Sequence, residues 1–275
     1  MMEFWQRFAQ HRGAVLGLGI LTFVLVLAIT APVLFPGDPF QAAGKPFEPP
    51  FQTFLFGTDT LGRDVAAGIA HGARTSLMIG LVATVIAVIV ATIIGGFAGY
   101  YGGWIDDVLM RITEFFQTIP SFIFAIVIVA ILSPKIEHIV FAIAAVTWPP
   151  ITRLVRGEFM AMRNREFVQA CIVLGMKDLA IIFREILPNA LSPIIVTGSL
   201  MVATAILIES ALAFLGLGDP NVMSWGFMIG AGRTFLRTAW WLCAIPGLAI
   251  LLTVLAINLV GEGLNDALNP RLRNR

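Results

Sequence analysis

The residues with reactive side chains are few and scattered in this sequence. Three histidines, His11, His71 and His138, lie far apart without the spacing of metal ligands, so we predict no metal site. The only Gly-Lys pair, Gly44 and Lys45, is followed by a proline, and no G-x-x-x-x-G-K-[ST] phosphate loop occurs. Neither a G-x-S-x-G elbow nor an H-E-x-x-H helix is present. We therefore expect a non-catalytic chain that does not itself hydrolyse ATP.

Two acidic residues, Glu114 and Glu209, stand inside apolar stretches. Acids at such positions in membrane proteins usually face the interior of a helix bundle or a water-filled cavity. Both are therefore candidates for lining a transport pathway, and we hypothesise that Glu209 receives a substrate ammonium group. An internal hydrogen bond or ion pair is the alternative for both acids, and Arg111 lies one helical turn from Glu114.

The composition predicts the environment in which these residues lie. Of the 275 residues, 58% are hydrophobic and 13% are charged, a far more apolar balance than that of soluble domains. Six stretches approach or exceed the roughly 20 residues needed to cross a bilayer, so we predict an all-α integral membrane protein with six transmembrane helices. The fourth is short and contains Pro149 and Pro150. The first is too long for a signal peptide and is interpreted as an anchor. The predicted spans are 14–35, 77–99, 108–132, 139–155, 191–217 and 241–260.

The basic residues predict the orientation. With the N-terminus inside, most lysines and arginines fall in cytoplasmic segments, so we expect both termini to be cytoplasmic. The net charge of +1 gives no reason to expect a nucleic-acid partner. Cys171 lies in a basic loop and Cys243 in an apolar run, so we expect both to be free thiols.

The largest predicted cytoplasmic loop, 156–189, has the pattern of two short amphipathic helices hinged at Gly175. Four residues in its first half follow the i, i+3, i+4, i+7 spacing of one helical face. Asp178 would provide a carboxylate in the first turn of the second helix, where the helix dipole favours it. Pro188 is expected to end that helix before the fifth span. The four residues on the shared face are Phe167, Ala170, Cys171 and Leu174.

This loop is similar to the coupling loop of ABC importer permeases, whose pattern is Glu-Ala-Ala, three residues, Gly, nine residues and Ile-x-Leu-Pro. The corresponding segments here are Gln169–Cys171, Gly175 and Glu185–Pro188. Gln169 lacks the charge of the family's glutamate, but its amide can still form hydrogen bonds. The resemblance implies a surface that couples to ATPase subunits. The residues expected there are Glu166, Gln169, Ala170, Gly175, Met176, Lys177 and Asp178.

Further blocks resemble the dipeptide, oligopeptide and nickel permeases, specifically their C-type subunit. We interpret the first block as a structural turn built by Gly57, Asp59, Gly62, Arg63 and Asp64, with its charged residues pairing locally. Gly95, Gly99 and Gly103 are spaced for close helix packing. The blocks are 57–64, 98–103, 214–218, 224–226, 246–247 and 258–271.

The resemblance implies an ABC transporter type I permease fold, working by alternating access in a bacterial inner membrane. It implies half of a translocation pathway for small peptides, shared with a homologous second permease. Two cytoplasmic ATPases would bind ATP and Mg, an external binding protein would deliver substrate, and this chain would hold no cofactor. Nickel complexes or opine-like compounds are the alternative substrates. A secondary transporter and a membrane-bound enzyme are the alternatives of other classes.

The predicted organisation is a single membrane domain embedded in lipid. It comprises a cytoplasmic segment 1–13, an anchor 14–35, an external Pro-rich loop 36–76, a core permease domain 77–260 containing the 156–189 loop, and a cytoplasmic tail 261–275.

Overall fold

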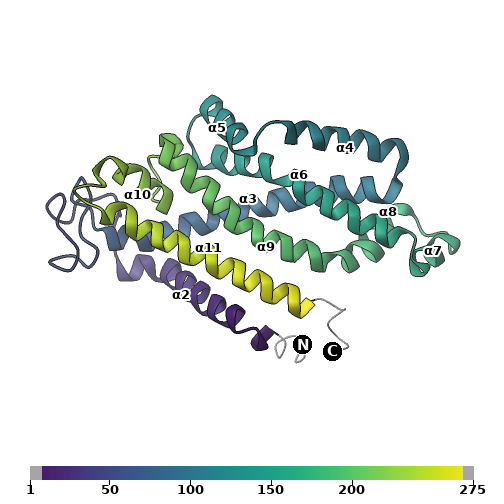
Figure 1. The fold of residues 1–275 in the computed structure, drawn as a ribbon, viewed down its shortest axis with the longest axis horizontal. Helices are drawn as coiled ribbons and strands as arrows, with labels where there is room; N and C mark the ends of the chain where they lie inside the picture. Colours follow the sequence, from purple (N-terminus) through teal and green to yellow (C-terminus); the bar gives the residue numbers. More distant parts are fainter. Residues whose placement is uncertain (1–7, 269–275) are drawn as a thin grey trace.

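The computed structural model describes residues 8–268, and within that range the regular structure is entirely helical (Figure 1). Four of the arginines that favour the predicted orientation lie outside the described residues: Arg7, Arg271, Arg273 and Arg275. The main helices are α2 (Arg12–Leu34), α3 (Val65–Tyr101), α4 (Gly103–Thr118), α5 (Ser121–Leu132), α6 (Ile136–Arg163), α7 (Glu166–Val173), α8 (Asp178–Ala180), α9 (Leu187–Leu212), α10 (Trp225–Gly232) and α11 (Trp241–Leu268).

Within residues 8–268, five helical segments are long and apolar enough to cross a membrane, or up to six if one bent pair is counted as a span. The bent pair corrects the predicted third span, 108–132, because α4 and α5 meet at 82° instead of forming one helix. Pro120 is the physical reason, since a proline disfavours helical backbone at the preceding residue. Ile119 accordingly has φ −92° and ψ 129°, which ends α4.

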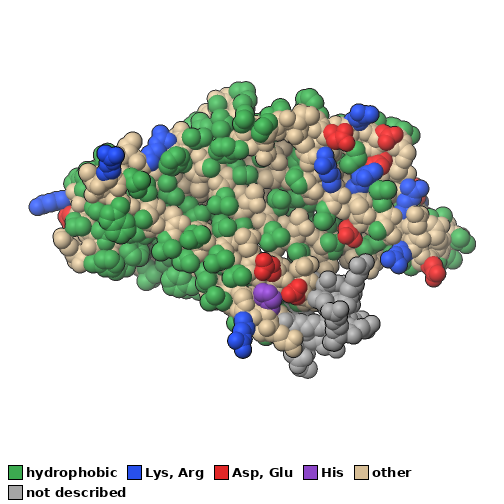
Figure 2. Space-filling view, viewed as in Figure 1, with side chains coloured by type: hydrophobic (Ala, Val, Ile, Leu, Met, Phe, Trp, Pro, Cys, Tyr) green, Lys and Arg blue, Asp and Glu red, His purple; other side chains and the backbone are tan. Residues whose placement is uncertain are grey.

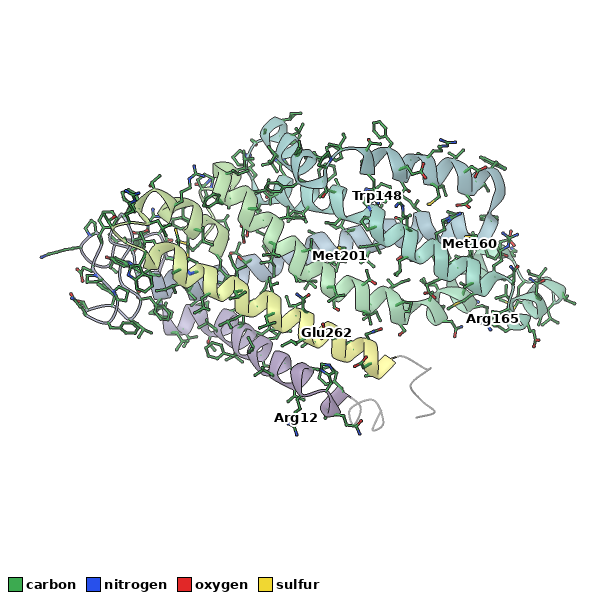
Figure 3. All side chains as sticks on the ribbon, viewed as in Figure 1. Arg12, Trp148, Met160, Arg165, Met201 and Glu262 are labelled. Carbon is green, nitrogen blue, oxygen red and sulfur yellow. The ribbon has the colours of Figure 1, made fainter. Side chains whose placement is uncertain are left out.

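The fourth predicted span forms a continuous helix despite its two prolines. Helix α6 runs for 28 residues through Pro149 and Pro150 and is the most buried of the candidate spans. Tertiary packing outweighs the local cost of the prolines here. Figure 3 labels Trp148, which lies beside the prolines and packs edge-on against Phe116 of α4, with ring centroids 5.2 Å apart.

Two glycines allow α3 and α6 to pack closely. A Cβ atom on Gly95 would lie 2.5 Å from the carbonyl oxygen of Thr152, and one on Gly99 would lie 2.6 Å from that of Arg156. The predicted small-residue contact is confirmed for these two positions. Gly103 differs, because its φ of +54° places it in the turn that begins α4, and a Cβ atom added to it would meet open space.

Helices α2 and α11 pack side by side and run in opposite directions, which brings the start of one near the end of the other (Figure 1). His11 Nε2 lies 4.0 Å from Asp266 Oδ2 across this contact. The 36–64 loop lies at the other end of these helices. In Figure 2, apolar side chains cover much of the visible surface, and charged side chains gather near α4 and α7. A broad apolar surface between polar ends is typical of a protein surrounded by lipid.

Candidate functional site

The turn between α7 and α8 is a Schellman motif centred on Gly175. Gly175 has φ +74°, a conformation that costs a glycine little because it lacks a Cβ atom. The amide of Gly175 donates to Ile172 O at 3.0 Å, and that of Met176 donates to Cys171 O at 3.0 Å. These two bonds satisfy carbonyls at the end of α7. The chain thus turns sharply at the glycine that the sequence identified as a hinge.

The helix after this turn continues further than predicted. Pro188 was expected to end it, but the helical segment runs from Asp178 to Leu217. A π-helical stretch over Ile181–Ile186 precedes the proline, and Leu187 N–H donates to Ile182 O across five residues. Pro188, which has no N–H to donate, directly follows this π-helical stretch, where the regular α-helical hydrogen-bond pattern is already altered. The prediction of a short second helix is therefore wrong, because the helix that begins at Asp178 continues into a spanning helix.

The side of α7 that packs against the rest of the protein is centred on Val168, which was not among the four residues predicted to share a helical face. Val168 is fully buried, and Cys171 is partly buried against the same cluster. Phe167 is 40% exposed, while Val173 is 87% exposed and Leu174 is 81% exposed. An apolar tip that projects into water is a common feature of protein interaction sites.

Two exposed residues expected at the coupling surface also form hydrogen bonds that hold the loop to the spanning helices. Asp178 accepts a hydrogen bond from the hydroxyl of Tyr100 at 2.7 Å. Gln169 donates its amide hydrogen to the carbonyl oxygen of Arg163 at 3.2 Å, an interaction that an ionised glutamate at this position has no hydrogen to make. Arg163 in turn donates to the carbonyl oxygen of Tyr101 at 3.2 Å. The amide of Gln169 therefore makes a hydrogen bond within this chain while its side chain stays exposed.

The other expected coupling residues are exposed or partly exposed. Glu166 lies in the first turn of α7, where the helix dipole favours an acid. Ala170 and Lys177 are exposed, and Met176 is partly buried against the cluster that holds Val168. Arg165, labelled in Figure 3, precedes α7 at this end of the molecule.

An ion pair that was not predicted from the sequence lies beside this loop. Both side-chain oxygens of Asp106, in the first turn of α4, accept hydrogen bonds from Arg156 of α6. The pair joins α4 to the helix that leads directly into α7. The acidic residues that follow Gly102 and Gly103 provided a signal for a helix start, but their partner lies 50 residues away.

Glu209 lies inside the fold instead of facing an open cavity. It is 2% exposed, and its carboxylate accepts hydrogen bonds from Ser224 at 2.7 Å and Ser210 at 3.3 Å. Ser224 caps α10 by accepting from Phe227 N at 3.0 Å. Glu209 therefore connects α9 to the start of α10. An internal hydrogen bond was the alternative to a pathway role that the sequence left open for this residue.

Glu114 has a different environment, because its side chain is exposed on α4. Within residues 8–268 no ion pair connects it to Arg111, so the partner suggested from the sequence is not used.

The 57–64 block forms a compact turn at the opposite end of the molecule. Asp59 pairs with Arg63 at 3.8 Å and also accepts its backbone N–H at 2.9 Å. Gly57 and Gly62 both have φ +75°, which favours glycine. Asp64 does not join the pair; it caps α3 by accepting from Ala66 N at 2.8 Å. Burial raises the pKa of Asp64, and its backbone hydrogen bonds oppose that shift.

Both cysteines are free thiols, as predicted.

Comparison with known proteins defines the class. Residues 91–274 match the model of the family described as binding-protein-dependent transport system inner membrane component. Residues 1–50 match that of the N-terminal TM domain of oligopeptide transport permease C. The chain belongs to this family of inner-membrane permease components of ABC importers. Such components work with ATPase subunits and an external substrate-binding protein.

Individual relatives match over nearly the whole chain. The di/tripeptide transport system permease protein DppC of Pseudomonas aeruginosa is 42% identical, with 100% of this chain and 93% of that protein covered. The dipeptide transport system permease protein DppC of Escherichia coli strain K12 is 43% identical, with coverages of 99% and 94%. The protein of the same description from Alkalihalophilus pseudofirmus is 41% identical, with coverages of 99% and 90%.

Proposed function

We propose that this chain forms half of the translocation pathway of an importer for di- or tripeptides. The observation that carries the proposal is full-length similarity to permeases described as transporting dipeptides and di/tripeptides. No specific observation favours nickel complexes or opine-like compounds. A secondary transporter is disfavoured because this family depends on binding proteins.

The second part of the proposal is that α7 and the Gly175 turn transmit movement of the ATPases. Val173 and Leu174 supply an exposed apolar contact at the tip. Val168 and the Tyr100–Asp178 bond fix the other side of the loop to the spanning helices. A loop held in this way moves as a rigid body with those helices, so that closure of the ATPases tilts them.

The third part concerns topology and assembly. The termini and α7 are cytoplasmic, the 36–64 loop is external, and a homologous permease completes the pathway. Two partner ATPases bind ATP and Mg, while this chain contributes no catalytic group. Glu114 of α4 is exposed within this chain and is the remaining candidate for facing the shared pathway.

Uptake measurements test the substrate and the assembly together. The chain is expressed with its neighbouring transporter genes in cells that lack peptide uptake, and accumulation of a labelled dipeptide and of nickel is measured. We expect ATP-dependent dipeptide accumulation that disappears when this gene, or the catalytic glutamate of an ATPase, is removed. Nickel accumulation without peptide accumulation would overturn the substrate assignment. Uptake by this chain alone would overturn the assembly.

A further inference from the structure

Arg74 is a cation on α3 for which the described part of the chain supplies no partner. Its side chain is exposed, and among residues 8–268 it takes part in no hydrogen bond, ion pair or cation–π contact. Two other arginines in this half of the molecule have internal contacts: Arg63 pairs with Asp59, and Arg233 lies over the ring of Phe214. Charged groups within spanning helices are usually paired, so Arg74 requires a partner from outside the described chain.

A contact made by the nearby His71 indicates the depth at which Arg74 lies. His71 Nε2 lies 3.1 Å from the carbonyl oxygen of Phe35, the residue at the end of α2. Arg74 follows His71 by three residues, which is roughly 4.5 Å further along α3. The guanidinium group therefore starts about one turn inside the end of α2. A long arginine side chain at this depth extends toward the lipid headgroups.

Arg74 lies on the wall of an apolar groove between α2 and α3. The groove has a volume of about 400 Å³. Its other walls are Leu25, Ala28 and Ile29 of α2 and Leu77 of α3, so among the described residues Arg74 is the only charged one that lines it. Ile29 is 76% exposed, so the groove opens outward.

The surface of α3 continues from Arg74 as an apolar stripe. Met78, Leu81 and Val85 follow it at i+4, i+7 and i+11, and all three are exposed. This spacing places them on the same helical face as the arginine. The stripe extends from Arg74 by about 16 Å, which is roughly half the thickness of the hydrocarbon core.

We propose that this groove binds an anionic phospholipid. The phosphate pairs with the guanidinium of Arg74, and one acyl chain lies between α2 and α3 along Leu25, Ile29 and Leu77. Guanidinium groups form paired hydrogen bonds with phosphate oxygens. Anionic and zwitterionic lipids both have such a phosphate, but the headgroup of a zwitterionic lipid carries no net negative charge to attract the arginine. The combination of one cation and apolar walls matches an anionic amphiphile. A non-helical acidic segment of another protein would leave backbone polar groups unsatisfied against these walls.

Native mass spectrometry of the purified transporter tests this site. The chain is purified from membranes with the subunits that accompany it and is titrated with phosphatidylglycerol or phosphatidylcholine of equal chain length. We expect wild type to prefer phosphatidylglycerol by about fivefold, the contribution of one cation near anionic lipid. Arg74→Gln should remove this preference, and Arg74→Lys should retain most of it. The matched control is Arg237→Gln, which removes an exposed arginine outside the groove.

The remaining variants separate the possible occupants. Ile29→Ser, at an exposed wall position, should weaken binding of the long-chain lipid but leave any binding of glycerol phosphate unchanged. A full phosphatidylglycerol preference in Arg74→Gln, or none in wild type, would overturn the proposal. The proposal would also be overturned if the purified Arg74→Gln complex lost another subunit while its lipid binding stayed unchanged. The partner of Arg74 would then be an acidic side chain of that subunit.

Discussion

Tyr100, near the end of α3, donates its phenolic hydrogen to the carboxylate of Asp178 across 2.7 Å. The bond joins a spanning helix to the first residue of α8, just after the Gly175 turn. The two residues are 78 positions apart in sequence, so only the fold brings them together. On the proposed coupling mechanism, a displacement of the loop around Gly175 would pass through this bond to α3.

Asp178→Lys should uncouple ATP hydrolysis from transport. Lysine only donates hydrogen bonds, so the acceptor for Tyr100 disappears, at a cost on the order of 1–3 kcal/mol. In proteoliposomes we expect several-fold less peptide transported per ATP hydrolysed. Tyr100→Phe should act in the same direction, and the effects of Tyr100→Phe and Asp178→Lys should be less than additive in the double variant. An unchanged transport ratio would remove this bond from the coupling mechanism.

Val173→Asp should release the ATPase subunits. The substitution places a charge at an apolar tip that is 87% exposed in this chain, so folding is spared while an apolar interface is disrupted. A central interface residue contributes about 2 kcal/mol or more, which corresponds to roughly 30-fold weaker association. Copurification measures the effect. Phe51→Asp, at a residue 78% exposed in the opposite loop, is the control and should retain the ATPases.

Glu209→Gln should support transport near the wild-type level, whereas Glu209→Ala should not. Glutamine retains an acceptor for the Ser224 hydroxyl, but alanine leaves this hydroxyl without its partner and creates a small cavity. We expect Glu209→Ala to lose about 2–4 kcal/mol of stability, measured by thermal unfolding in detergent. A stable Glu209→Gln variant with greatly weakened peptide transport would restore the substrate-binding hypothesis.

Gly99→Ala should destabilise the contact between α3 and α6. The added Cβ would lie 2.6 Å from the carbonyl oxygen of Arg156, so the helices would have to separate. The expected cost is about 1–3 kcal/mol, observed as a lower unfolding temperature. Gly19→Ala is the matched helical control, because no atom lies within 4 Å of its added Cβ. That variant should be neutral or more stable by up to about 1 kcal/mol, because alanine favours helix.

Asp106→Asn should loosen α4 from α6. It removes the charge from a carboxylate that pairs with Arg156, and hydrogen bonds to charged groups contribute about 1.5–3 kcal/mol. Limited proteolysis in the 102–120 region should accelerate, and the Asp106→Arg/Arg156→Asp exchange should restore part of the protection. Asp107→Asn changes the exposed neighbour and serves as the control. Equal proteolysis of all variants would show that the pair does not hold α4.

The sequence determined the class of the protein and the approximate position of most spans, because a bilayer demands long apolar helices and leaves few other solutions. It also identified Gly175 as a turn and Gly95 and Gly99 as contact positions. Each of these features is encoded locally, by an apolar run, by a glycine that permits positive φ or by small residues at helical spacing.

Only the tertiary structure decided how those elements are used. Packing keeps α6 continuous through Pro149 and Pro150, while Pro120 breaks the third span where less of the fold surrounds it. The environments of Glu209 and Asp178 depend on Ser224 and Tyr100, which are distant in sequence, and no local pattern specifies such partners. A side chain's type can be read from its position in the sequence, but the group that satisfies it is chosen by the way the helices pack.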